Sequence, residues 1–288
     1  GGAGFIGSNF VLGLRKSRPD VTIVNVDLLT YAGNLENLSA LEQDDGHLFV
    51  RADVAERFDM EPVFAEHGFD GLIHFAAESH VDRSILDATP FVRNNIQGTQ
   101  VLLDLARAHD VERFLQVSTD EVYGALGAEG LFSETTPLAP NSPYSASKAS
   151  ADMLVRAAHE THGYNVSITR CSNNYGPLQF PEKLIPLMIA NALEDKPLPV
   201  YGDGMQIRDW LHVSDHCSAL WTVFENGAAG SVYNIGGNNE WANINVVKLL
   251  LEILGKPESL IEYVTDRLGH DRRYAIDASL IRDELGWE

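Results

Sequence analysis

The sequence is short of positive charge and of long apolar runs. Its 288 residues hold 21 Lys and Arg against 41 Asp and Glu, a formal net charge of −20. This balance argues against a general nucleic-acid or anionic-membrane surface, because both need clustered positive charge. No uninterrupted apolar run approaches the ~20 residues of a membrane-spanning helix. We therefore expect no nucleic-acid partner and no membrane segment, and any anionic ligand must be held by a few local cations or by backbone N–H groups.

Cysteine is scarce as well. Cys171 and Cys217 are too few for a disulfide scaffold and indicate a reducing compartment, so we expect a cytoplasmic protein. Neither cysteine has an adjacent base in the sequence that would activate it, and both are interpreted as core residues. The ten histidines show no spacing typical of metal ligands, and no metal site is predicted.

Short β-branched and aromatic runs alternate with longer stretches of helical periodicity. Strands are expected at 21–26, 72–75, 114–119, 166–169 and 232–235, and helices at 90–109, 145–162 and 244–254. This alternation predicts an α/β fold, a Rossmann-type doubly wound parallel sheet with helices on both faces. From about residue 172 the sequence becomes loop-rich, which indicates a smaller C-terminal lobe. Because the chain begins inside a glycine-rich segment without Met, we expect the natural protein to be longer at both ends.

The glycine-rich segment has glycines at positions 1, 4 and 7 and predicts a phosphate-binding turn. Glycine lets the backbone approach a pyrophosphate, and the N-terminus of the following helix stabilises negative charge. Such a site needs an acid about 20 residues on, and Asp27 follows the expected strand at 21–26. A carboxylate there suits the ribose 2′-hydroxyl of NAD; the alternative is a plain turn with a surface Asp. Asp53 is placed near the adenine or as a loop cap.

Tyr144 and Lys148 lie one turn apart on an expected helix. An ammonium group beside the phenol would lower its pKa and make it a usable base. The spacing alone also fits an ordinary pair of helix neighbours.

Thr119, Asp120 and Glu121 stand at the end of the expected strand at 114–119, where ligands bind in parallel sheets. The hydroxyl can share a substrate oxygen with Tyr144, and the two carboxyl groups can act as separate acid and base. The alternative is a cap on a helix or loop.

These features resemble the extended short-chain dehydrogenase/reductase superfamily and, within it, the nucleotide-sugar 4,6-dehydratases. The likeness runs over essentially the whole chain. Besides the glycine loop and the Tyr144/Lys148 pair, it is carried by Phe75–Ser84, Ser118–Gly124, Arg170–Pro177, Tyr201–Gly204, Arg208–Trp210 and Asp266–Tyr274. Leu268 stands where the family usually has Pro.

The resemblance implies an NAD-dependent hydro-lyase that acts on a nucleotide-diphospho-glucose, with thymine favoured as the base by overall likeness. Glu121 would remove the proton on carbon 5 and Asp120 would protonate the departing 6-hydroxyl. The implied catalytic residues are Thr119, Asp120, Glu121, Tyr144 and Lys148.

The resemblance also implies the binding residues. The cofactor set is Gly1, Gly4, Phe5, Ile6, Gly7, Asp27, Leu28, Leu29, Thr30, Asp53, Val54, Phe75, Ala76, Ala77, Ser79, Asn94, Tyr144, Lys148 and Asn174. The substrate set is Ser79, Thr119, Asn173, Lys183, Leu184, Pro199, Val200, Tyr201, Arg208, Asn243, Asp266, Arg267 and His270. Residues 1–171 with about 212–236 are assigned to the NAD-binding domain, and about 172–211 with 237–288 to the nucleotide-sugar lobe.

Three alternatives stay open. The donor could carry uracil or cytosine instead of thymine. The scaffold could serve a 4-epimerase or a decarboxylase, against which the Asp120–Glu121 pair argues. A catalytically silent NAD-dependent sensor is disfavoured by the intact Thr119, Tyr144 and Lys148. In this superfamily the helices equivalent to 90–109 and 145–162 build a homodimer interface, so a homodimer is expected.

Overall fold

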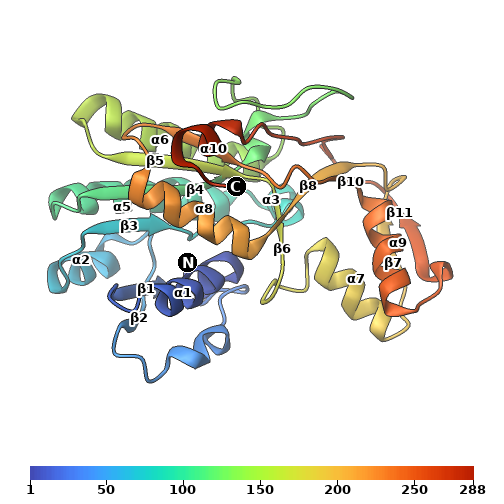
Figure 1. Ribbon diagram of the computed structural model, residues 1–288, viewed down its shortest axis with the longest axis horizontal. Helices are drawn as coiled ribbons and strands as arrows, with labels where there is room; N and C mark the ends of the chain where they lie inside the picture. The colour runs from blue at the N-terminus through green and yellow to red at the C-terminus, as the bar shows by residue number, and fades with distance from the viewer.

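The main body of the molecule is a layer of parallel strands between two layers of helices (Figure 1). The computed structural model describes residues 1–288. Four strands pair in the order β3-β4-β5-β9, and β1 pairs with β2; all these pairs are parallel. The bounds are β1 Ile23–Asp27, β2 His47–Arg51, β3 Gly71–His74, β4 Arg113–Thr119, β5 Val166–Cys171 and β9 Val232–Ile235. The predicted α/β class is confirmed, and each predicted strand is found within a few residues of its expected place.

Neighbouring residues of β4 face opposite helical layers, because side chains alternate along a strand. Phe114 packs into a core cluster with residues of α2, α5 and α6, whereas Leu115 packs with residues of α1, α8 and α10. Both side chains are fully buried. The helices are α1 Phe5–Ser17, α2 Arg57–Glu66, α3 Val81–Leu86, α5 Gly98–Ala108, α6 Pro143–His162, α8 Val213–Asn226 and α10 Ser279–Leu285. None of the molecule's helices is long and apolar enough to cross a bilayer.

Helix α6 begins two residues before its predicted start. Ser142 caps it: its hydroxyl accepts from the backbone N–H of Ser145, and the Ser145 hydroxyl accepts from that of Ser142. Pro143 occupies the first turn, where a missing N–H costs nothing. The helix ends at Gly163, whose φ of 65° is the left-handed conformation that glycine adopts readily. This cap fixes the start of the helix that carries Tyr144.

The predicted helix at 90–109 is interrupted. A short turn, α4 Thr89–Phe91, leads into a π-helical segment, η2 Val92–Gln97, before α5 begins. Asn95 is buried in this segment, where its amide donates to the Ser147 hydroxyl at 2.8 Å and to the Glu78 carbonyl at 3.0 Å. The wider turn ties the segment to α6 and to the loop after β3.

A smaller body lies to one side of the main sheet (Figure 1). Helices α7 Leu184–Leu193 and α9 Asn243–Leu254 pack on the parallel pair β7 Leu198–Tyr201 and β11 Ile261–Val264. This body has its own apolar cluster, which includes Met188, Leu198 and Leu251. A three-stranded sheet joins it to the main body, made of β6 Asn173–Tyr175, β8 Ile207–His212 and β10 Glu240–Ala242. The remaining elements are the 3₁₀ turns η1 Leu35–Leu41, η3 Asp120–Tyr123 and η4 Glu258–Leu260.

We predict that Leu115→Ala lowers the free energy of unfolding by about 2–5 kcal/mol, since it opens a cavity in a packed core. Urea denaturation followed by circular dichroism measures the change. Leu193→Ala, which removes the same atoms from a side chain in a residue that is 60% exposed, is the matched control and should stay close to wild type. Equal midpoints for the two variants would contradict the central position of β4.

Candidate active site

A cavity of about 360 Å³ lies where the parallel strands end. All five predicted catalytic residues line it, together with the whole predicted cofactor set except Leu29. From the predicted substrate set it is lined by Ser79, Thr119, Asn173, Lys183 and Leu184. The loops after β1, β3, β4 and β5 therefore converge on one space, as the strand-end rule for parallel sheets leads us to expect.

The glycine loop lines one end of this cavity. A Cβ on Gly7 would collide with the carbonyl oxygen of Gly1, and a Cβ on Gly1 would collide with the backbone of Ala76. Helix α1 starts at Phe5, directly after the loop, so its first N–H groups lie at the cavity. This is a backbone cradle of the kind that binds a pyrophosphate.

Asp27 stands at the end of β1 and holds the loop in place. One carboxylate oxygen accepts from the Ala3 N–H at 3.0 Å and the other from the Leu29 N–H at 2.8 Å. Leu29 itself lies outside the cavity and has a φ of 59°, so its part is to turn the chain around Asp27. The carboxylate reaches the cavity while bonded on both sides, which fits a fixed acceptor for a ribose hydroxyl.

Three other predicted cofactor residues are held by specific partners. Asp53 accepts from the Ala55 N–H and pairs with Arg93 at 2.8 Å, so it is both a loop cap and a cavity residue. The amide of Asn94 donates to Glu78 at 3.4 Å. The Asn174 carbonyl oxygen accepts from Nδ1 of the buried His216 at 2.8 Å. Burial lowers the pKa of His216 to about 3, so the ring is a neutral donor that orients the amide.

The turn after β4 presents the predicted acids to the cavity. Strand β4 ends at Thr119, and Asp120–Tyr123 forms a single 3₁₀ turn. The Thr119 hydroxyl oxygen accepts from the Glu121 N–H at 3.3 Å and lies at the same distance from a carboxylate oxygen of Asp120. The other Asp120 oxygen is buried and has no hydrogen-bond partner.

The two carboxyl groups differ in their surroundings. Burial and then the charge of Glu121 raise the pKa of Asp120 well above its usual range. Burial also raises the pKa of Glu121, but Arg267, Arg208 and Lys183 oppose that shift. Of the two groups, Asp120 is therefore the one whose protonated form its surroundings favour, and Glu121 is the one that the nearby cations favour as a carboxylate.

The pKa of Tyr144 is shifted in the opposite direction from the one expected. Burial and the charge of Glu121 raise its pKa well above the usual value, although the Thr119 hydroxyl opposes this shift. Lys148 donates a hydrogen bond to the carbonyl oxygen of Val117 at 2.8 Å, and burial lowers its own pKa. The pKa of Tyr144 is thus raised and not lowered as expected from Lys148, because removing the phenol from water penalises the phenolate. A positive charge bound against the phenol would act in the opposite direction.

Three cations gather near Glu121, as the acidic composition requires for an anionic ligand. Lys183 donates to the Ser79 carbonyl at 2.8 Å and Arg208 to the carbonyls of Ile207 and Asp271 at 2.7 and 3.0 Å. Neither lies within 4.0 Å of a carboxylate oxygen, and burial lowers the pKa of both. Arg267 has a buried Nε without a hydrogen-bond partner. Arg208 is buried and the other two residues are half-buried. Incompletely paired cations in such surroundings favour an anionic ligand.

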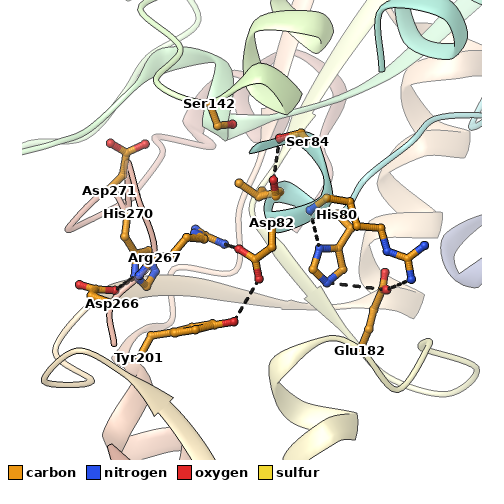
Figure 2. A network of polar contacts seen from close by, with 12 residues as sticks. His80, Asp82, Ser84, Ser142, Glu182, Tyr201, Asp266, Arg267, His270 and Asp271 are labelled. Carbon is orange, nitrogen blue, oxygen red and sulfur yellow. Dashed lines mark hydrogen bonds and ion pairs between the residues drawn. The ribbon is translucent and has the colours of Figure 1, made fainter. Parts of the chain in front are cut away.

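The other predicted substrate residues stand beside the cavity and not in its wall. Tyr201, Asp266, Arg267 and His270 form one polar network, in which His270 and Asp266 approach to 2.6 Å (Figure 2). Asn243 begins α9 and has a buried carbonyl oxygen without a partner.

Strand β7 divides its predicted substrate residues between two faces. The side chain of Val200 packs with Leu198 in the core of the smaller body, which leaves only the Val200 backbone for a ligand. Pro199 and Tyr201 point to the opposite face, because side chains alternate along the strand.

Several cavity residues were not predicted. Val117, Ser118, Cys171 and Ser172 belong to the ends of β4 and β5, and the strand-end rule applied to every strand would have found them. Glu78 and Trp210 lie in segments that carry the family resemblance, although neither was assigned to the site. No sequence signal marked the remaining ones, which are Ala32, Gly33, Ala52, Gln179, Phe180 and Glu182.

Comparison with known proteins agrees with this fold. A family model described as GDP-mannose 4,6 dehydratase matches residues 1–288. The chain belongs to this family of nucleotide-sugar dehydratases.

The names of individual relatives are more specific than the description of the family. It is 56% identical, over 306 residues, to dTDP-glucose 4,6-dehydratase of Xanthomonas campestris pv. campestris (strain B100), with all of this chain and 87% of that protein covered. The structure of dTDP-glucose 4,6-dehydratase from Bacillus anthracis str. Ames in complex with NAD has a TM-score of 0.94 and 51% identity, and the match covers 100% and 89% of the two chains. That from Streptomyces venezuelae, with NAD and dTDP bound, has a TM-score of 0.97 and 48% identity, with 100% and 90% covered.

We predict that neither cysteine reacts as a thiol in the folded protein. Burial raises the pKa of Cys171 and of Cys217 to about 12, so at pH 8 only about one molecule in 10⁴ would carry either thiolate. Titration with a disulfide reagent should label both thiols in denaturant and neither within minutes in buffer. Rapid labelling of one thiol in the native protein would contradict the buried placement.

Proposed function

We propose that this protein converts dTDP-glucose into dTDP-4-keto-6-deoxyglucose and water. The reaction is an internal oxidation, elimination and reduction that needs NAD and consumes none. When bound, NAD accepts a hydride from carbon 4 of the glucose and returns it to carbon 6. The glycine cradle, Asp27 and the cavity fit a dinucleotide, and relatives of this chain have been solved with NAD.

The observation that carries the proposal is the unequal pair Asp120–Glu121. Elimination of water across carbons 5 and 6 needs one group that removes a proton and another that donates one. Asp120, whose pKa burial raises well above its usual range, is the acid, and Glu121, faced by three cations, is the base. Adjacent carboxyl groups with opposite proton states supply both functions from one turn of the chain.

The remaining catalytic side chains act at the 4-hydroxyl group. Tyr144 takes the proton of this hydroxyl, and the Thr119 hydroxyl holds the same oxygen. The phenol ionises only with help from nearby positive charge, because burial and Glu121 raise its pKa. Lys148, one turn along α6, is the fixed cation of this part of the site, anchored at the Val117 carbonyl. The ketone formed at carbon 4 makes the carbon-5 proton acidic enough for Glu121 to remove, and Glu121 gives a proton back to carbon 5 when carbon 6 receives the hydride.

We assign the diphosphate to Lys183, Arg208 and Arg267, with Asn173 and Asn243 nearby for the sugar and nucleotide. The division into an NAD-binding domain (1–171 with about 212–236) and a nucleotide-sugar lobe (about 172–211 with 237–288) follows from this assignment. It is supported by the separate apolar cluster of α7 and α9. Thymine is proposed as the base because relatives at 56% identity act on dTDP-glucose according to their names.

The proposal includes a homodimer in the cytoplasm. Helices α5 and α6 pack against each other, and Met153 on α6 is 47% exposed although it is apolar. Covering such a side chain by a second copy of the same helices would remove apolar surface from water. Two free thiols, Cys171 buried and Cys217 half-buried, fit a reducing compartment.

An epimerase or decarboxylase on the same scaffold is the second candidate. It would use Tyr144, Thr119 and Lys148 in the same way. Burying Asp120 without a hydrogen-bond partner for one oxygen is costly, and an enzyme that needs no second acid has no reason to bear that cost. The buried pair therefore favours dehydration.

We predict that the protein, incubated with dTDP-glucose and catalytic NAD, yields a product lighter by one water, with no net formation of NADH. Glu121→Gln keeps the shape of the side chain but cannot accept the carbon-5 proton. Its turnover should fall by about 10²–10⁴-fold, the usual contribution of a general acid or base. Reduced cofactor should accumulate on this variant, because oxidation at carbon 4 does not need Glu121. Mass spectrometry and absorbance at the NADH band measure the two effects.

Each contrary result has a distinct meaning. A product of unchanged mass with an inverted carbon 4 would replace dehydration by epimerisation. Water loss from UDP- or CDP-glucose but not from dTDP-glucose would contradict the thymine assignment alone. A Glu121→Gln variant with wild-type turnover would contradict the role of the carboxyl pair.

A further inference from the structure

Asp82 joins the two bodies of the molecule at the edge of the site. It lies in the first turn of α3, in the segment after β3, whereas its partners Tyr201 and Arg267 come from β7 and from the loop after β11. The Tyr201 hydroxyl donates to Oδ2 of Asp82 at 3.1 Å, and Nη1 of Arg267 lies 3.6 Å from Oδ1 (Figure 2). One carboxylate thus contacts two side chains of the predicted substrate set.

The contact with Arg267 is an incomplete ion pair. Its 3.6 Å separation is longer than a hydrogen bond, and Oδ1 of Asp82 is a buried atom without a hydrogen-bond partner. Nε of Arg267 is also buried and without a partner. The guanidinium is therefore held near Asp82 while part of its donor set stays free. Buried donors without partners carry a free-energy penalty that an anionic ligand would relieve.

The three neighbouring cations Lys183, Arg208 and Arg267 need negative charge nearby to offset their mutual repulsion. Arg267 lies close enough to Lys183 and Arg208 to lower the pKa of both. Three cations around one point repel each other when no anionic ligand is present. The carboxylates that offset this repulsion at Lys183 are Glu182, Glu121 and Asp82. Of these, Glu121 is the proposed base.

The carboxylate of Asp266 holds the rest of the loop after β11. Asp266 accepts from the Arg267 N–H at 2.8 Å and from Gln206 at 3.1 Å, and it contacts His270. These bonds hold the backbone of the loop, and none of them involves the Arg267 guanidinium. Asp82 is the carboxylate that faces the end of that side chain.

We propose that Asp82 is a positioning residue for the nucleotide diphosphate. It holds Arg267 and Tyr201 in the orientation that receives the substrate, and it acts through them without touching a reacting atom. This inference rests on the proposed function, because the anion in question is the diphosphate of the nucleotide-sugar. It assigns Asp82 an effect on substrate binding and none on the elimination step.

The sign of the effect distinguishes positioning from simple charge repulsion. If Asp82 only repelled the diphosphate, then Asp82→Asn would tighten the binding of dTDP. If Asp82 positions Arg267, the same change should weaken dTDP binding and raise KM by about tenfold, a shift of about 1.4 kcal/mol, with kcat within about twofold of wild type. Asp82→Glu, which retains the charge, should recover part of the loss.

The test is a double-mutant cycle in which dTDP binding is measured by titration calorimetry. Since Asp82 acts mainly through the charge of Arg267, with a smaller part through the Tyr201 hydroxyl, adding Asp82→Asn to Arg267→Gln should weaken binding by less than about twofold beyond the single Arg267 change. Asp195→Asn is the charge-matched control: it removes one acidic charge from the smaller body, which also carries Tyr201 and Arg267, on a side chain paired with Lys256 and 68% exposed. Its affinity and KM should equal those of wild type.

The outcomes separate this inference from the proposed function. Tighter or unchanged dTDP binding in Asp82→Asn, with normal wild-type turnover, overturns the positioning role and leaves the dehydratase reaction intact. Full additivity with Arg267→Gln overturns it too. A fall in kcat with unchanged KM would move Asp82 into the chemical step. Failure of the wild-type protein to bind dTDP or release water would overturn both proposals. Melting temperatures of all variants within a few degrees of wild type establish that folding is preserved.

Discussion

The placement of two adjacent carboxyl groups at the end of β4, with Asp120 buried and Glu121 half-buried, is the constraint on which the rest of the site depends. Carboxylates removed from water are strongly destabilised unless they are protonated or faced by positive charge. Here Asp120 is stabilised in its protonated form, whereas Glu121 is stabilised by nearby positive charge. Burial, and then the charges of Glu121 and Asp209, raise the pKa of Asp120. The charges of Arg267, Arg208 and Lys183 act on Glu121 in the opposite direction. An acid and a base thus arise from one short turn.

The fold supports this arrangement from both sides. On the sheet side, the turn that carries the acids ends in Tyr123, whose hydroxyl accepts from Arg170 at 3.0 Å; Arg170 in turn pairs with Asp152 of α6 at 2.9 Å. That chain of contacts ties the turn to the helix of Tyr144 and Lys148. On the other side, the cations come from β8 and from segments next to α7 and β11, so the smaller body supplies the charge that the main body lacks. The chain's large negative charge makes this local supply necessary.

The main strands and helices, and the gathering of the catalytic residues at the end of β4, could be predicted from the sequence. Strand and helix periodicity located β4, β5 and α6, and the strand-end rule then placed Thr119, Asp120 and Glu121 beside Tyr144. The raised pKa of Tyr144 could not be predicted, because it depends on burial by distant segments and on Glu121. The π-helical turn at Val92–Gln97 had no sequence signal, since it is held by contacts of Asn95 with α6 and the loop after β3. Asp82 lies within the segment Phe75–Ser84 that carries the family resemblance, but its partners Tyr201 and Arg267 lie over 100 residues away in the sequence.

The most direct test of the account is the proton state of Asp120. We would label aspartate with ¹³C at the side-chain carboxyl carbon and record NMR spectra against pH, and assign Asp120 as the resonance missing from Asp120→Asn. The account predicts that this carboxyl is still protonated at pH 7, because burial and Glu121 raise its pKa. A resonance that titrates near the ordinary aspartate value of about 3.9, and is ionised at neutral pH, would contradict the division of acid and base between the two carboxyl groups.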